Sequence, residues 1–308
     1  MRSFLFVPGD SERKQAKALA TSADALILDL EDSVDVSQLP AARARVREVL
    51  AHGSSGLRSR PDGRNRPQQL WVRVNALSSG LLLEDLAAVM PDKGEGGPDG
   101  VVLPKVSALR EVEEISHYLA ALEVRGGQEL GATRLMVIAT ETPAGLLALP
   151  SYPEKMTPVV AQRLAALTWG SEDLGAALGV NARVDENAVP TPTFQIARTW
   201  CLLTAAALSV QAIDGVCVDF RNREGLAREL AHARRDGFTG KLAIHPDQVE
   251  AINAAFVPTE QELARAQRII AAFAAAPGAG VVSLDGQMID RPHLVQAHRV
   301  LAAAPPRA

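Results

Sequence analysis

Short apolar runs recur along the chain, and most are followed by a stretch in which apolar residues return at helical spacing. Several runs are continuously apolar, which is typical of parallel strands that are covered on both faces. We predict strands at 3–7, 25–30, 70–75, 100–105, 134–140, 165–170, 215–219 and 241–245. The strand–helix rhythm predicts an α/β fold, a closed TIM-type (β/α)8 barrel, with a doubly wound open sheet as the main alternative.

Helices are expected between the strands at 11–21, 39–51, 108–122, 193–208 and 223–235, with Ser11 as the N-cap of the first. Two more, 246–255 and 259–276, follow the eighth strand, and a tail that ends in a helical pattern covers 281–304. We therefore predict a barrel domain at 1–256 and a C-terminal helical extension at 257–308. Gly278 and Gly280 would act as a hinge that lets the tail close as a lid.

Two segments interrupt the rhythm. Residues 52–69 are rich in Arg, Pro, Gly and Ser, and are expected to form an exposed excursion. Residues 143–163 contain several prolines and are expected to form a long loop over the barrel mouth.

Composition narrows the class of protein. With 308 residues and 47% hydrophobic content, the chain can bury one large core. A net charge of -4 gives no electrostatic argument for a nucleic-acid or anionic-membrane partner. Cys201 and Cys217 lie in apolar contexts and are read as buried small residues in a reducing cytoplasm. The apolar runs are too short for a signal peptide or a membrane span.

Acidic residues gather at the predicted strand ends, where a barrel of this type carries its catalytic groups. Carboxylates that share a cavity repel one another unless a cation lies among them. Without a His or Cys cluster, Mg²⁺ is the natural cation and Mn²⁺ the second choice. Glu141 and Asp173 are candidate ligands, since Mg²⁺ commonly takes one or two protein carboxylates. Helix capping and ion pairing are the alternative roles, and are preferred for Asp10, Asp32 and Glu172.

Basic residues also stand at these ends. Arg73 can grip a carboxylate or enolate oxygen, or pair with Asp29 or Glu31, and the two roles are compatible. Lys105 is interpreted as an electrostatic or structural residue, because nearby carboxylates disfavour a neutral amine. His245 is read as a packed strand-end residue.

Several stretches together resemble the HpcH/HpaI aldolase and citrate lyase beta-subunit family, especially its stand-alone CoA-ester lyases. They are RSFLFVPGD at 2–10, LILDLEDSV at 26–34, WVRVN at 71–75, VVLPKV at 101–106, ATET at 139–142, WGSEDLGAALG at 169–179, GKLAIHPDQVEAIN at 240–253 and DGQMIDRPHLVQA at 285–297. They stand in family order over nearly the whole chain.

The resemblance implies a metal-dependent lyase that assembles as a trimer or hexamer. It implies Mg²⁺ held by Glu141 and Asp173, and a substrate carboxylate bound by Arg73. It further implies that Asp290, in the sequence MID, enters a neighbouring subunit's site as the acid/base, and that Glu31 lies near the metal waters.

The implied reaction is a retro-Claisen cleavage of a 2-hydroxyacid CoA thioester, such as malyl-, citramalyl- or citryl-CoA, to acetyl-CoA and a 2-oxoacid. Ser11, Arg13 and Lys14 open the first helix, where free N–H groups suit the CoA phosphates, although a solvated first turn is an equal alternative. The other readings are a citrate lyase beta subunit acting on citryl-acyl-carrier protein, a CoA-independent 2-oxoacid aldolase, a malyl-CoA thioesterase and a barrel without catalysis.

Overall fold

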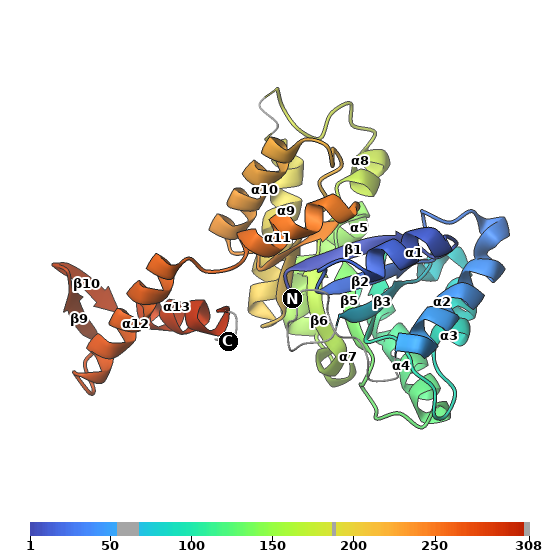
Figure 1. Cartoon of the computed structure of the whole chain (residues 1–308), viewed down its shortest axis with the longest axis horizontal. Coiled ribbons are helices and arrows are strands. Elements are labelled where there is room, and N and C mark those ends of the chain that lie inside the picture. The colour runs from blue at the N-terminus through green and yellow to red at the C-terminus, as the bar shows by residue number, and fades with distance from the viewer. Residues whose placement is uncertain (54–67, 187–188, 305–308) are drawn as a thin grey trace. The chain divides into compact units, whose positions relative to one another are not determined.

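A computed structural model describes residues 1–53, 68–186 and 189–304 (Figure 1). The chain divides into two compact units, Met1–Asn253 and Ala254–Ala308. In the first unit, eight parallel strands close on themselves in the order β1 to β8. The last strand pairs with the first, with Ser3 opposite Lys241, so the barrel prediction is confirmed and the open sheet is excluded.

The strands are short and lie close to seven of the eight predicted positions. They are β1 (Ser3–Pro8), β2 (Ala25–Asp29), β3 (Gln69–Arg73), β4 (Gly100–Leu103), β5 (Arg134–Ile138), β6 (Leu164–Thr168), β7 (Gln211–Asp214) and β8 (Gly240–Ala243).

Alternation along the strands decides which side chains fill the barrel. Phe4, Ile27 and Trp71 belong to the apolar cluster inside it. Trp71 packs so closely on β4 that a Cβ at Gly100 would lie 2.3 Å from its ring, which explains the glycine. Since side chains on one strand alternate between faces, Asp29 and Arg73 share the inward face with the residues two positions before them. The barrel interior is therefore apolar along most of its length and charged at the carboxyl ends of the strands.

The seventh strand is the one that the sequence pattern misplaced. Residues 215–219 were predicted as the strand, but β7 lies four residues earlier and 215–219 form a loop. The strand ends in Asp214, a fully buried carboxylate that accepts hydrogen bonds from Lys241 and Trp169. Because this buried ion pair breaks the apolar run, the more apolar sequence after it looked like the strand.

Helices surround the barrel in the usual outer layer (Figure 1). The α-helices of the first unit are α1 (Glu12–Leu19), α2 (Leu39–Gly53), α3 (Leu82–Val89), α4 (Leu109–Arg125), α5 (Pro143–Ala148), α6 (Tyr152–Lys155), α7 (Pro158–Arg163), α8 (Glu172–Leu178), α9 (Pro192–Ala207) and α10 (Arg223–Asp236), and α11 (Val249–Ala255) spans the boundary to the second unit. Helix α3 was not predicted. Ser11 stands at the N-cap of α1, but its side chain makes no capping hydrogen bond.

The proline-rich segment 143–163 differs from expectation. It forms the short helices α5, α6 and α7 instead of a loop over the mouth, and these pack against α8, α9 and α4, respectively. Leu149, Tyr152 and Val160 are fully buried, so the segment supplies part of the outer layer. Prolines at the first turn of each short helix suit this role, because their missing N–H is not needed there. The other irregular segment, 52–69, lies largely outside the described residues.

The second unit is a small α+β body. It contains α12 (Glu260–Ala274), a hairpin of β9 (Val281–Leu284) and β10 (Gln287–Asp290), and α13 (Arg291–Ala302). Asp285 and Gly286 turn the hairpin with positive φ values of 52° and 74°, the conformation of a two-residue primed turn.

Gly278 and Gly280, the predicted hinge, do not lie at the boundary between the two compact units. Ala266 and Ile269 of α12 share a buried cluster with Ile289 of the hairpin and Ala297 of α13. Gly278 and Gly280 therefore lie inside the compact second unit, whereas the boundary between the units falls after Asn253.

Two further expectations concern burial and membranes. Cys201 and Cys217 are both buried free thiols, as predicted. Among the described helices, none has the length and apolar character needed to cross a bilayer.

Candidate active site

Charged side chains converge at the carboxyl ends of β2 to β6. Asp29 and Arg73 end neighbouring strands and stand opposite each other in register. Arg73 donates from Nε to Asp29 Oδ1 and from Nη2 to Asp29 Oδ2, both at 2.7 Å. Its guanidinium also lies 4.8 Å from the centre of the Phe6 ring. Two of its three nitrogens are thus committed to a fixed fork, which orients the third.

The third nitrogen faces Glu31. Arg73 Nη1 lies 2.7 Å from Glu31 Oε2, but that buried oxygen has no hydrogen-bond partner of good geometry. Burial raises the pKa of Glu31, and the charges of Arg73 and Lys105 only partly offset this effect. Asp29 behaves differently: burial alone would raise its pKa, but its hydrogen bonds to Arg73 outweigh burial and lower it. Arg73 therefore pairs with both Asp29 and Glu31, the two partners proposed for it from the sequence.

Lys105 lies at the centre of the group. Its ammonium contacts Glu31, lies 2.9 Å from Asp32 Oδ1 and is 3.5 Å from Asp173 Oδ1. Its backbone N–H donates to Glu141 Oε2 at 2.6 Å. One residue consequently contacts four carboxylates from three segments of the chain.

Glu141 and Asp173 form the candidate metal pair. Glu141 is only 5% exposed, and burial together with the negative charges of Asp173 and Glu31 raises its pKa to about 8, despite the hydrogen bond from Lys105. Asp173 lies in the first turn of α8 and its side chain is 32% exposed. A buried carboxylate beside others is destabilised in its charged form, and a divalent cation relieves that cost.

The donor set fits Mg²⁺. Within the described ranges, no cluster of three or more His, Cys, Asp or Glu side chains has the geometry of a protein-only metal site. Mg²⁺ does not need one, because it keeps several waters and accepts substrate oxygens as ligands. Glu141 and Asp173 would hold it, leaving the remaining positions to solvent and substrate.

A clasp between two strand ends positions this pair. Gly170 N donates to Thr140 Oγ1 at 3.1 Å, and Thr140 Oγ1 donates to Gly170 O at 3.3 Å. A Cβ at Gly170 would lie 2.8 Å from Glu141 Cγ, so glycine leaves room for that side chain. Sequence reasoning missed these residues, although they lie next to the two ligands in the motifs ATET and WGSED.

A second support was also missed. Trp169 Nε1 donates to Asp214 Oδ1 at 2.8 Å, and Arg198 and Lys241 hold the same carboxylate. This buried network fixes the start of the loop that leads to Asp173. Its signal in the sequence was a lone Asp inside an otherwise apolar segment.

The other predicted site residues lie elsewhere. Arg13 and Lys14 are exposed on α1. Asp290 belongs to the second unit, where it ends β10 and its carboxylate lies 2.5 Å from His293 Nδ1. His245 stacks on Phe220, with ring centres 4.4 Å apart, and accepts from Asp247 N, which agrees with the packed role expected for it.

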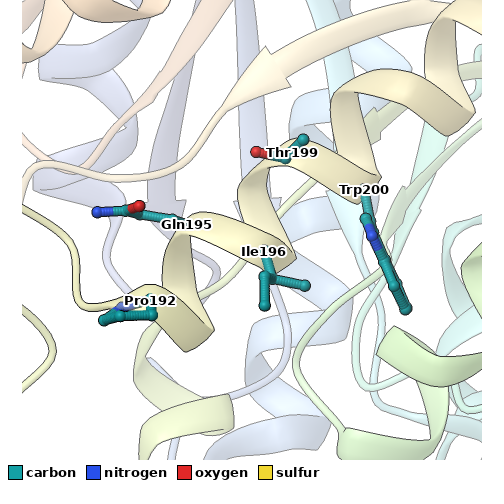
Figure 2. A pocket seen from close by; sticks show the side chains of 5 residues that line it. All are labelled: Pro192, Gln195, Ile196, Thr199 and Trp200. Atoms are coloured by element: carbon teal, nitrogen blue, oxygen red, sulfur yellow. The ribbon is translucent and has the colours of Figure 1, made fainter.

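Helix α9 carries a hollow of about 270 Å³ that is separate from these charged residues. It is lined by Pro192, Gln195, Ile196, Thr199 and Trp200, which all lie along one helix (Figure 2). The lining has no ionisable side chain, so we assign no chemistry to it.

Comparison with known proteins agrees with this geometry. A family model described as HpcH/HpaI aldolase/citrate lyase matches residues 2–246. The mitochondrial citramalyl-CoA lyase of Rattus norvegicus is 33% identical over 98% of this chain and 86% of its own length. The citrate lyase subunit beta of Escherichia coli K12 is 34% identical over 98% of this chain and 93% of its own.

Two further matches bear on the reaction and its ligands. A (3S)-malyl-CoA thioesterase of Cereibacter sphaeroides is 34% identical over 98% of this chain and 94% of its own length. The CitE protein of Mycobacterium tuberculosis, solved with magnesium, acetoacetate and coenzyme A, superposes with a TM-score of 0.71 at 29% identity. That match covers 98% of this chain and 97% of the other.

Proposed function

Because the chain belongs to the HpcH/HpaI aldolase and citrate lyase family, we propose that it is a Mg²⁺-dependent lyase of 2-hydroxyacid CoA thioesters. The substrates would be of the malyl-CoA, citramalyl-CoA or citryl-CoA type, and the products acetyl-CoA and a 2-oxoacid. The observation that carries the proposal is the pairing of buried Glu141 with Asp173 at the barrel mouth, beside an oriented arginine.

Each side chain then has a task. Glu141 and Asp173 would hold the cation. Bound Mg²⁺ would supply a Lewis acid that favours ionisation of the 2-hydroxyl group and stabilises the oxoacid oxygens. Arg73 would bind the substrate carboxylate through Nη1, which lies 2.7 Å from Glu31 Oε2 in the structure, since Asp29 occupies its other two nitrogens. Glu31 would orient water near the cation.

The bond-breaking step needs an acid. The carbon–carbon bond of the 2-hydroxyacid breaks, its electron pair passes to the thioester enolate, and the hydroxyl proton passes to solvent. Asp290 of a neighbouring copy would protonate the enolate carbon, so that one proton is lost and one gained. In the condensation direction, the same carboxylate would remove that proton. We infer a trimer or hexamer in which this residue crosses between copies.

The CoA tail would lie at the start of α1. Ser11 stands at the N-cap and Arg13 and Lys14 in the first turn, where the basic side chains are exposed and the backbone N–H groups have no partner within the helix. A helix start of this kind suits phosphate groups.

Hydrolysis is the second candidate outcome. The malyl-CoA thioesterase of Cereibacter sphaeroides matches as much of the chain as the lyases do. A thioesterase would release CoA and the intact hydroxyacid, or free acetate after cleavage, so the products separate the two reactions.

The test is a product assay. Purified protein with Mg²⁺ is given malyl-, citramalyl-, methylmalyl- and citryl-CoA, and the products are read by mass spectrometry. We expect acetyl-CoA or propionyl-CoA with a 2-oxoacid from at least one substrate, and none after EDTA treatment or in Glu141→Gln and Asp173→Asn. Full activity in metal-free protein would sink the proposal, and free CoA as the primary product would favour the hydrolase.

A further inference from the structure

We propose that Lys105 is a positioning residue that acts as the counter-ion of the carboxylates at the barrel mouth. Its ammonium holds these carboxylates together when Mg²⁺ is absent and weakens the binding of Mg²⁺ to them. The inference rests on the proposed metal site at Glu141 and Asp173. It starts from the position of Lys105, whose ammonium lies within ion-pair distance of both Asp32 and Asp173.

The backbone of Lys105 is unusual. Its φ of +53° places it in the left-handed region, which residues other than glycine rarely adopt. Outliers of this kind persist where the surroundings hold them, and they gather at functional sites. Here the conformation lets the residue act in two directions at once, since its N–H reaches Glu141 Oε2 while its ammonium reaches Glu31 and Asp32. An extended residue at the end of β4 would not turn both groups toward the rim.

The charge of Lys105 is secure. Its ammonium contacts Glu31 and lies 2.9 Å from Asp32 Oδ1, and neighbouring carboxylates favour the charged form of an amine. A neutral amine, and with it a nucleophilic role, is therefore disfavoured. The ammonium remains the positive charge that separates Asp173 from Glu31 and Asp32.

Mg²⁺ and the ammonium compete for the same carboxylate. Lys105 Nζ lies 3.5 Å from Asp173 Oδ1, and the Asp173 carboxylate is also one of the two that would hold the metal. A divalent ion at Asp173 would stand a few ångströms from a fixed positive charge, and two like charges at that distance repel even in a water-like medium. Lys105 thus stabilises the arrangement of the carboxylates in the metal-free protein and lowers the affinity of the site for Mg²⁺.

The experiment is calorimetric titration of metal-free protein with MgCl₂. Removing one charge a few ångströms from a divalent ion changes its binding by about tenfold, so Lys105→Gln should bind Mg²⁺ about tenfold more tightly than wild type. It should also gain more in Tm on adding Mg²⁺, since repulsion among its carboxylates is no longer relieved by the lysine. Lys105→Arg keeps the charge and should stay close to wild type.

Lys105→Gly guards against misfolding, because glycine adopts a positive φ without steric cost. It should match Lys105→Gln in Mg²⁺ affinity. Unchanged or weaker Mg²⁺ binding in either folded variant, or tighter binding in Lys105→Arg as well, would overturn the counter-ion role. Wild-type protein that binds no Mg²⁺ through Glu141 and Asp173 would instead refute the proposed metal site.

Discussion

At the scale of single residues, the rim shows how neighbours decide the role of a charged group. Asp29 and Glu31 are both buried acids two positions apart, yet the pKa of Asp29 is lowered and that of Glu31 is raised. Asp29 receives two guanidinium hydrogen bonds, whereas Glu31 Oε2 receives none of good geometry. Asp29 is therefore a fixed structural anion, while Glu31 is held by its ion pairs with Arg73 and Lys105.

The two hydrogen bonds between Arg73 and Asp29 allow a specific prediction about oxoacid binding. Arg73→Lys keeps a positive charge but cannot bond both Asp29 oxygens and still direct a nitrogen into the site. We expect oxoacid affinity to fall about 10- to 100-fold, the worth of one charge-assisted hydrogen bond, with little change for CoA. Calorimetry with pyruvate and with CoA measures both, and Arg235→Lys, on an exposed helix face, is the control. An equal loss of both ligands would contradict the assigned role.

The motifs allowed the charged residues of the site to be named from the sequence, because their types and their places at strand ends are visible there. Their pairings were not visible. The register between β2 and β3 determines that two nitrogens of Arg73 bind Asp29. The path of the loop after β4 determines the left-handed backbone of Lys105. These contacts depend on tertiary packing, which the local pattern of apolar and polar residues does not reveal.

At the scale of elements, the continuous apolar runs located seven strands because parallel strands buried on both faces need them. The prediction of β7 failed because a buried ion pair at Asp214 interrupted the apolar run. The hairpin β9–β10 went unrecognised, although the Asp285-Gly286 pair between two apolar runs is a strong turn signal. The short helices after Glu141 were mistaken for a loop because their prolines were read as helix breakers instead of first-turn residues.

The clasp between the ends of β5 and β6 can be tested with one methyl group. A Cβ at Gly170 would meet Glu141 Cγ at 2.8 Å, so Gly170→Ala should push the carboxylate away from Asp173. We expect weaker Mg²⁺ binding in calorimetry with the far-ultraviolet spectrum unchanged. Gly280→Ala, where nothing lies within 4 Å of the added atom, is the matched control. If both variants bind Mg²⁺ alike, the clasp does not set the position of Glu141.

The end of α4 is tied to α7 by a buried ion pair that predicts a pH-dependent stability. Glu123 accepts from Arg163 Nη1 and Nη2, both at 2.6 Å, and from the N–H groups of Gly131 and Thr133. Removing one partner of such a pair leaves an uncompensated charge. Glu123→Gln should therefore lower the free energy of unfolding by about 3 kcal/mol at neutral pH, as measured with urea.

The sign of the pH effect follows from the direction of the pKa shift. Burial tends to raise the pKa of Glu123, but the hydrogen bonds from Arg163 and the backbone outweigh it and lower the pKa. The carboxylate therefore stabilises the fold above its unfolded-state pKa, and that contribution is lost as the pH falls through its lower folded-state pKa. The difference between wild type and Glu123→Gln should shrink in acid. Glu95→Gln, which breaks a half-exposed pair with Arg47, should cost about 1 kcal/mol or less.

At the scale of the whole molecule, the two compact units divide the proposed machinery. The candidate metal ligands and Arg73 belong to Met1–Asn253, and Asp290 belongs to Ala254–Ala308. On β10, Ile289 is buried against α12 and α13, so Met288 and Asp290 lie on the opposite face of the strand. Met288 is 72% exposed there. An apolar side chain beside an acid on an open hairpin face suits a surface that closes over a thioester.

The last prediction is that Asp290 completes the site of another copy. Asp290→Asn keeps the shape of the side chain at the N-cap of α13, so the fold should survive, while loss of the acid should abolish turnover. Mg²⁺ and oxoacid binding should persist, because their residues lie in the barrel unit. Mixing Asp290→Asn with Glu141→Gln subunits should restore part of the activity, since some pairs combine an intact barrel with an intact hairpin. Differently tagged chains confirm subunit exchange, and either variant mixed with itself is the control. Verified mixed oligomers that remain inactive would mean that Asp290 serves its own chain or is not the acid, and the shared-site model would then have to be abandoned.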